Sequence, residues 1–389
     1  MKTGIATIPL DYGRCPRWLF ERMKRLSRGI FLAIREEFGP EEILKRLSDP
    51  VWFQSLGCLL GFDWNSSGLT TTTLGALKAG IFDIQDQLGI YVCGGKKESR
   101  KTPQEIEAYG ISRAFPFYKD LVYASKMAAK VDSSLIQDGF QIYAHNFIFS
   151  KNGSWVVIQQ GMNTVFQKAR RYHWLSLDYK NKKFVEEPHS GIVSNIKTKP
   201  LNLTAKESEK NRLVAKELVV EEPKTFLKDI KLITEKINSK GGLFRIKENE
   251  LVKQKKSSQF TELELKNIEF HWHPVVEEKF NLKFLEKTIF LAHSQKPKNF
   301  EELVSLKGVG PKTIRALSLV SEIIYGAKPS YEDPARYSFS VGGKDGTPFP
   351  VERETYDKLL KIMERGIQKS VISLREKEQT KQRLHRIFK

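Results

Sequence analysis

The strongest constraint on how this chain folds is a glycine turn near its carboxyl end, between two helical patterns. Apolar residues recur at helical spacing on both sides of the turn, beginning with Leu303 and Leu306. The turn is Gly308-Val309-Gly310, and glycine accepts conformations that other residues avoid and lets another backbone approach closely. Pro311 suits the first turn of a helix, whose free N–H groups and dipole attract anions. We therefore predict two short helices joined by an anion-binding hairpin, to which Lys312 adds a charge.

The same residues resemble the helix-hairpin-helix motif. The motif's pattern of leucines, Gly-Val-Gly, lysine and threonine is matched at Leu303, Leu306, Gly308, Val309, Gly310, Lys312 and Thr313. The resemblance implies that the hairpin amides bind the DNA backbone without reading its sequence. It assigns DNA contact to Gly308, Val309, Gly310, Lys312 and Thr313. The alternative is an ordinary helical corner with glycine at its turn.

The charge of the chain agrees with a polyanionic partner. Its 389 residues contain 65 Lys and Arg against 46 Asp and Glu, which gives a formal net charge of +19. Nucleic acid is the commonest partner for so basic a protein. The alternative is a lysine-rich surface of the kind found in thermophiles.

The cysteines and the hydropathy indicate the compartment. Cys15, Cys58 and Cys93 show no paired spacing, which argues against a disulfide framework or a zinc finger and favours a reducing environment. No apolar run reaches the length of a membrane span, and the start lacks the core of a signal peptide. We predict a cytoplasmic protein with no membrane contact.

Basic residues also follow a glycine turn in the amino-terminal half. Tyr91-Val92-Cys93 predicts a short strand, and the Gly94-Gly95 turn after it leads to Lys96, Lys97 and Arg100. We interpret this segment as a loop facing nucleic acid, with a plain surface loop as the alternative.

The densest polar chemistry runs from Asp132 to His189. Two apolar strands flank residues 151–154, where Asn152-Gly153 predicts a hairpin turn. Pairing of the strands brings their open ends together, and carboxylate, amide, imidazole and guanidinium groups gather there. These groups belong to Asp132, Gln137, Asp138, His145, Gln159, Gln160, Asn163, Arg170, Arg171, His173 and His189. We expect several of them to form one site, with Arg170 and Arg171 contacting DNA.

One hypothesis for this cluster is a metal-dependent nuclease. Asp132 and Asp138 would hold Mg²⁺ or Mn²⁺, and His145, Gln160 and His173 would complete the site. The second strand carries glutamine at the positions where a nuclease would need a carboxylate, which weakens the nuclease hypothesis. A polar network that satisfies buried groups is the alternative.

A second catalytic hypothesis comes from a resemblance to the helix-hairpin-helix base-excision glycosylases. Lys312 follows Gly-Val-Gly, and Asp333 comes 21 residues later, beyond Gly326 and Pro329. In those enzymes such a lysine forms a Schiff base with the sugar, and such an aspartate assists departure of the base. The resemblance implies a glycosylase and abasic-site lyase that needs no cofactor. Asp333 is followed by Pro334-Ala335, which departs from the family pattern.

Nearly the whole chain resembles one family, domain of unknown function 763, found mostly in archaea and thermophilic bacteria. The resemblance rests on segments at residues 67–72, 89–95, 137–139, 159–163, 169–174, 333–336 and 342–346. It implies that the amino-terminal part and the hairpin part work as one unit.

The resulting prediction is an α+β protein. It has an amino-terminal mixed α/β domain with a β-hairpin (1–195), a charged linker with some helix (196–224) and an all-helical domain (225–389) that carries the hairpin (303–324) and a basic carboxy-terminal helix. The predicted function is backbone binding to DNA in repair or maintenance, with glycosylase or lyase activity. A metal-dependent nuclease and a non-catalytic DNA-binding scaffold are the alternatives.

Overall fold

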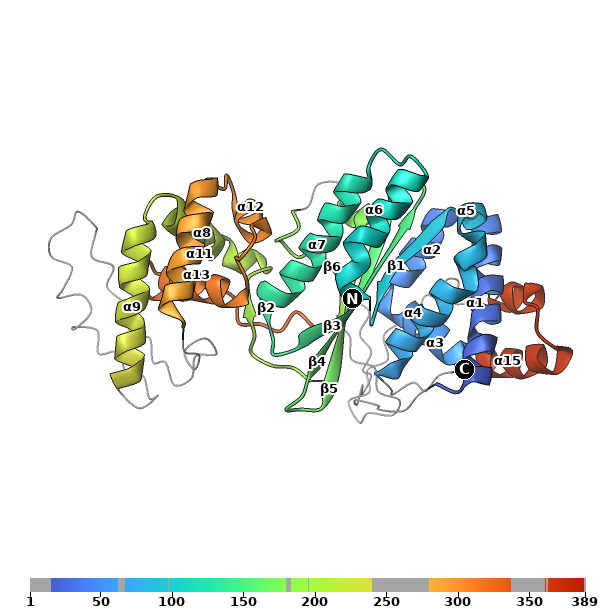
Figure 1. The fold of residues 1–389 in the computed structure, drawn as a ribbon. Helices are drawn as coiled ribbons and strands as arrows, with labels where there is room; N and C mark the ends of the chain where they lie inside the picture. Colours follow the sequence, from blue (N-terminus) through green and yellow to red (C-terminus); the bar gives the residue numbers. More distant parts are fainter. Residues whose placement is uncertain are drawn as a thin grey trace.

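The computed structural model describes residues 15–61, 67–96, 98–179, 183–194, 196–239, 280–336, 361 and 363–387. Its centre is a five-stranded antiparallel sheet in the order β1-β3-β4-β5-β6 (Figure 1). The strands are β1 (Ile90–Gly95), β3 (Gln141–Ser150), β4 (Trp155–Asn163), β5 (Lys168–Leu175) and β6 (His189–Val193). A small second sheet pairs β2 (Ile136–Gln137) with β7 (Leu201–Asn202). The fold is α+β, as the sequence predicts.

The predicted β-hairpin is present. β3 ends at Ser150 and β4 begins at Trp155, so the turn between them contains Asn152 and Gly153. Gly153 has a positive φ of 87°, a conformation that glycine accepts without strain.

One face of the central sheet packs against amino-terminal helices. Their bounds are α1 (Arg17–Phe38), α2 (Pro40–Ser48), α3 (Pro50–Leu59), α4 (Gly68–Ile81) and α5 (Gln85–Leu88), with a 3-10 turn η1 (Phe82–Ile84). Asp49 separates α2 from α3, and its side chain accepts the N–H groups of Val51 and Trp52 and so caps α3. Apolar residues from the sheet, including Val156 and Ile158, share a core with these helices.

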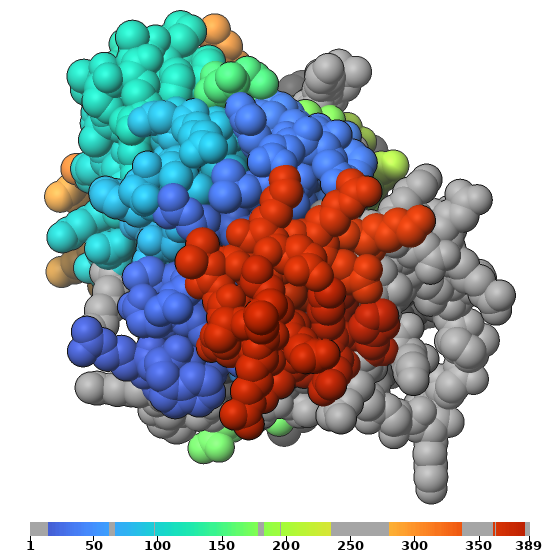
Figure 2. Space-filling view, turned by 90° about the vertical axis from the view of Figure 1, so that its right-hand side faces the viewer, coloured from blue at the N-terminus to red at the C-terminus, as the bar shows by residue number. Residues whose placement is uncertain are grey.

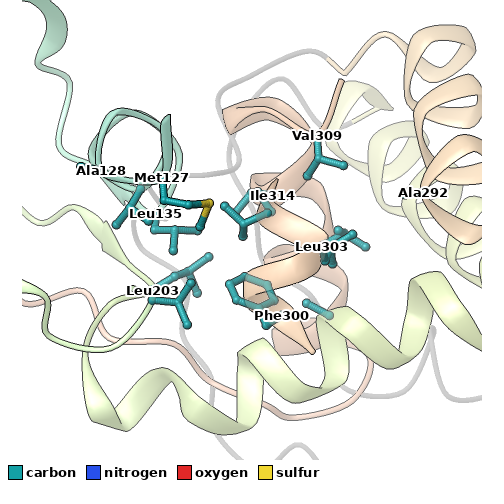
Figure 3. Packing of buried hydrophobic residues seen from close by; sticks show 14 of the residues in the cluster. Met127, Ala128, Leu135, Leu203, Ala292, Phe300, Leu303, Val309 and Ile314 are labelled. Carbon is teal, nitrogen blue, oxygen red and sulfur yellow. The ribbon is translucent and has the colours of Figure 1, made fainter. Parts of the chain in front are cut away.

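The opposite face packs against α6 (Thr102–Ser112) and α7 (Tyr118–Ser134), and their core continues into the carboxy-terminal helices. These are α8 (Glu209–Val220), α9 (Pro223–Ser239), α11 (Leu282–Gln295), α12 (Phe300–Ser305) and α13 (Pro311–Ile323). Short 3-10 turns η2 (Ser99–Lys101), η3 (Ser176–Tyr179) and η4 (Lys206–Ser208) complete this part. Figure 3 shows Met127 of α7 and Leu135, which follows α7, facing Ile314 and Phe300 across the boundary between the two halves.

The segment 196–224, which the sequence indicated as a charged linker with some helix, is largely folded. It contains β7 and α8, and the α8 residues Asn211, Ala215 and Leu218 are buried. The amide of Asn211 donates to the carbonyls of Ser318 and Ala327, which fixes α8 to α13 and the loop after it. Composition alone suggested a linker because the segment is rich in charged residues, of which Glu209, Lys210 and Glu217 are exposed whereas Arg212 is buried. Whether the two halves fold independently stays a prediction.

The basic carboxy-terminal helix α15 (Leu374–Ile387) does not join the helical part that carries the hairpin. It packs with residues 363–369 against α1 and α3, as Figure 2 shows in red over blue. Leu384 is buried there, and Arg22 of α1 donates to the hydroxyl of Thr380 at 2.6 Å. A Cβ on Gly29 would lie 2.6 Å from the carbonyl oxygen of Gly366, so the two backbones approach closely. The placement differs from the prediction because an amphipathic pattern predicts that one face of the helix is buried but does not specify the surface against which that face packs.

Candidate nucleic-acid interface

The hairpin between α12 and α13 has the conformation that its residues predict. Gly308 has a φ of 92°, in the left-handed region that favours glycine. Val309 is only 1% exposed and anchors the turn in the core. Gly310 is extended and caps α13, with Pro311 in the first turn. The first helical hydrogen bond of α13 runs from the N–H of Ile314 to the carbonyl of Gly310 at 3.0 Å.

The amino end of α13 leaves backbone donors without a bonded acceptor. Within the part of the chain that the structure describes, the backbone N–H groups of Gly310, Lys312 and Thr313 meet no hydrogen-bond acceptor. Among the described residues, nothing lies within 4 Å of the position that a Cβ on Gly310 would take, so an incoming group can reach the backbone. The side chains of Lys307 and Lys312 are exposed beside this opening. Oriented N–H groups, a helix dipole and two lysines suit a phosphate group.

The hairpin is held against the amino-terminal half by three polar side chains. Lys130 of α7 donates to the carbonyl of Leu306, and burial lowers the pKa of Lys130 to about 8. The amide nitrogen of Gln137 donates to the carbonyl of Pro311 at 2.9 Å, and its amide oxygen accepts from Arg315. These contacts fix the direction in which the free N–H groups point.

The structure does not bring Lys312 and Asp333 into contact. Lys312 is exposed on the hairpin, whereas the side chain of Asp333 is 4% exposed. One carboxylate oxygen of Asp333 accepts from Arg170 at 2.8 Å and from the N–H of Thr198 at 2.8 Å. The other accepts from the N–H of Ala335 at 2.9 Å. The carboxylate is therefore committed to a buried ion pair and to the local backbone.

The polar residues of the amino-terminal half form three separate buried networks, which corrects the expectation of one site. Side chains alternate between the two faces of a strand, so neighbours such as Gln159 and Gln160 point to opposite faces. Arg170 and Arg171 are separated in the same way. Both arginines are at most 1% exposed, so they are not at the surface where DNA contact was predicted.

The first network lies between the sheet and α7. Asp132 is fully buried and accepts from Gln159 at 2.5 Å, from Trp174 at 3.1 Å and from His189 at 2.5 Å. The amide oxygen of Gln159 accepts from Nδ1 of His145 at 2.8 Å. Since Nδ1 donates there, Nε2 of His145 accepts from the Ser125 hydroxyl at 2.9 Å. Burial lowers the pKa of His145, which favours this neutral form.

The second network holds a guanidinium between two carboxylates. Arg170 donates to Asp138 at 2.8 Å as well as to Asp333, and the Tyr172 hydroxyl donates to Asp138 at 2.7 Å. The guanidinium also stacks on the ring of Phe140, 4.6 Å from its centroid. Burial raises the pKa of Asp138, and the charge of Arg170 opposes that shift. The network ties the segment around Asp333 to β5.

The third network lies on the face covered by α2 to α4. Arg171 donates to His173 at 2.8 Å, to Gln54 at 3.0 Å and to Thr70 at 3.3 Å. Its guanidinium lies over the ring of Phe53, and burial lowers the pKa of Arg171. His173 donates through Nδ1 to the carbonyl of Leu47 at 3.0 Å, and burial lowers its pKa well below the usual value.

Gln160 belongs to the same face of the sheet. Its amide nitrogen donates to the carbonyl of Ser67 at 2.9 Å and to the Tyr143 hydroxyl at 2.6 Å. Gln160 is therefore separated from Asp132 by the sheet.

Among the residues that the structure describes, no group of three or more His, Cys, Asp or Glu is placed to hold a metal ion. Asp132 and Asp138, the carboxylates proposed for Mg²⁺ or Mn²⁺, belong to different networks. Of the predicted basic loop, Lys96 and Arg100 are exposed, and the Nζ of Lys96 lies 5.6 Å from the centroid of the Tyr143 ring. Lys97 lies outside the described residues.

Comparison with known proteins supports the full-length resemblance noted from the sequence. The model of the family described as protein of unknown function (DUF763) matches residues 4–351. The chain belongs to this family. No curated protein and no solved structure matches it. None of the helices that the structure describes in this DUF763 protein is long and apolar enough to cross a membrane.

Sequence reasoning missed the role of Lys130, which is central to the position of the hairpin in this DUF763 protein. Lys130 lies between the buried residues Ala128 and Val131 in the sequence of α7. A lysine on a helix usually keeps its charged end in water. Its contact with Leu306 joins residues 176 positions apart, and no local pattern in the sequence indicates such a pair.

Proposed function

We propose that this protein binds DNA through the phosphate backbone, with the α12–α13 hairpin as the primary contact. The observation that supports this most is the open space at Gly310 beside three free N–H groups and two exposed lysines. A phosphate oxygen satisfies several such donors at once, and it does so on any sequence. The net charge of +19 favours the same class of partner.

The decisive variant is Gly310→Val. Gly310 is extended, with φ −125°, a conformation that valine adopts, and no atom of the described residues lies within 4 Å of a Cβ placed there. In the complex, however, the valine side chain occupies the space that a phosphate would enter. We expect duplex affinity to fall about tenfold or more, with only a small drop in melting temperature, because valine is a poorer N-cap than glycine. Fluorescence anisotropy with a labelled duplex and thermal unfolding measure the two quantities.

A charge-matched pair of variants separates the hairpin from general electrostatics. Lys312→Glu lies on the hairpin, whereas Lys119→Glu changes the same charge at an exposed residue at the far end of α7. We expect Lys312→Glu to weaken binding strongly and to reduce the salt dependence, and Lys119→Glu to have a small effect. Equal effects of the two variants would reject the hairpin as the contact.

Cleavage of DNA stays a prediction. The glycosylase hypothesis needs Asp333, whose carboxylate is occupied by Arg170 and Thr198. The nuclease hypothesis needs carboxylates that belong to different networks. Incubation with duplexes that carry uracil, an oxidised base or an abasic site, in EDTA or in magnesium, tests both hypotheses alongside binding.

A further inference from the structure

The turn between β4 and β5, residues 164–167, presents two apolar side chains to solvent; we call it the β4–β5 tip. Val165 is 85% exposed and Phe166 is 50% exposed. Figure 1 shows the two strands extending beyond the lower edge of the sheet, so the tip projects from the body of the molecule. Scattered exposed apolar residues are normal on protein surfaces, but two adjacent ones on a projecting turn form a distinct feature.

The tip has a fixed shape. The side-chain oxygen of Asn163 accepts the backbone N–H groups of both Val165 and Phe166 at 3.0 Å, which closes the turn. A Cβ on Gly139 would lie only 3.0 Å from Nδ2 of Asn163, so the chain before β3 is seated against the turn. The side chains of Val165 and Phe166 are therefore presented by a supported turn.

The tip and the hairpin lie on connected parts of the structure. Gln137, which binds Pro311 and Arg315 in the hairpin region, comes two residues before Gly139, which abuts Asn163. Two residues of chain span at most about 7 Å, so these two contacts lie close together. The short segment that contacts the hairpin therefore also supports the tip.

Several basic side chains lie toward the end of the sheet that carries the tip. Lys96 lies over Tyr143 on β3, near the pairing of Gln141 with Met162 just before the tip. On the other side, the exposed Lys197 and Lys199 flank Thr198, which is bound to Asp333 beside Arg170. Lys168 begins β5 directly after the tip. Exposed apolar residues at a basic end of the sheet match a nucleic acid, whose bases are apolar and whose backbone is anionic.

We propose that Val165 and Phe166 form a wedge that inserts between the bases of duplex DNA held at the α12–α13 hairpin. The inference rests on the proposed function. Opening a base stack is least costly where a base is missing or unpaired. The favoured ligand is therefore a duplex with a local defect in stacking.

The test compares an intact duplex with one that carries an abasic analogue lacking the reactive aldehyde, next to 2-aminopurine. We expect the wild-type protein to bind the defective duplex about tenfold more tightly and to raise the 2-aminopurine fluorescence as stacking is lost. The variant V165S/F166S should bind both duplexes with the affinity of the wild type for intact duplex and should leave the fluorescence unchanged. Phe82→Ser, which removes an apolar side chain 67% exposed at η1, is the matched control and should behave as wild type.

The outcomes separate the wedge from the hairpin. If V165S/F166S keeps the tenfold preference, or if the wild type binds intact duplex but shows neither preference nor fluorescence change, the wedge is rejected and backbone binding stands. If the wild type binds neither duplex, both proposals fail. Sedimentation of the wild type and of V165S/F166S tests whether a second copy of the chain binds at the tip. Self-association of the wild type that is lost in the variant would assign the tip to that contact.

Discussion

Arg170 is fully buried, and its guanidinium lies between the carboxylates of Asp138 and Asp333. Three charged groups in a dry environment are costly to bury, and the hydrogen bonds among them offset that cost only while all are present. Such a network fixes geometry, here the position of the segment around Asp333 on β5. This arrangement explains why the side chain of Asp333 is buried although the residue lies outside any helix or strand.

We predict that Arg170→Met lowers the free energy of unfolding by about 3–5 kcal/mol, because it leaves two buried carboxylates without a counter-charge. Urea denaturation measures the change. The control is Arg365→Met, which removes one partner of the surface ion pair with Glu37, where Arg365 is 62% exposed. That variant should lose at most about 1 kcal/mol. Similar losses in the two variants would contradict the structural role of the buried network.

At the scale of elements, the hairpin gains its position from α7 and β2. Short helices such as α12, with six residues, are unstable alone, so packing and polar contacts to a neighbour hold them. Lys130 supplies one such contact by donating to the carbonyl of Leu306, and the burial of Lys130 there lowers its pKa to about 8. The attachment of the hairpin should therefore depend on pH.

We predict that the stability of the wild type rises, relative to Lys130→Met, between pH 7 and pH 9.5. The pKa of Lys130 is about 8 in the folded chain, below its ordinary value of about 10.5. Between these values the unfolded chain binds more protons than the folded chain, so the free energy of unfolding increases with pH. Because Lys130 is partly exposed, solvent screening reduces the gain to about 1 kcal/mol.

Urea denaturation at the two pH values measures this difference. The exposed Lys119→Met variant is the control and should follow the wild type. A constant difference between wild type and Lys130→Met across this range would show that Lys130 carries no burial cost.

At the scale of the whole molecule, the sheet is covered on both faces and carries a neutral buried histidine on each. His145 faces α7, and His173 faces the amino-terminal helices. Burial lowers the pKa of both side chains in the folded chain. Each of the two cores therefore contains a group that resists protonation while the chain is folded.

We predict that the protein loses stability as the pH falls below about 6.5, the ordinary pKa of histidine in an unfolded chain. There the unfolded chain takes up protons that the folded chain does not, so the free energy of unfolding falls by up to about 1.4 kcal/mol per pH unit for each histidine. His173→Gln keeps one donor and one acceptor and should lose less stability between pH 6.5 and 5. The double variant His145→Gln/His173→Gln should lose less again. If urea denaturation shows that the free energy of unfolding changes equally with pH in the wild type and in both variants, neither histidine stays neutral in the folded chain.

The sequence by itself determined the local features of this protein. Glycine at residues 308 and 310, followed by Pro311, specified the hairpin turn, and Asn152-Gly153 specified the turn between β3 and β4. Glycine accepts backbone conformations that other residues avoid, and proline fixes its own φ. The α+β class also followed from local periodicity. The alternation of side chains along β5 was available in the sequence as well, and it would have separated Arg170 from Arg171.

Only the tertiary structure decided which distant groups meet. Asp333 could have faced Lys312, but the folded chain places it on Arg170, 163 residues away along the sequence. Helix α15 could have covered any apolar surface, and it covers α1 and α3. Hydrophobic burial is not directional, and an ion pair requires only a nearby opposite charge, so such partners are selected by the packing of the whole chain rather than by the residues beside them.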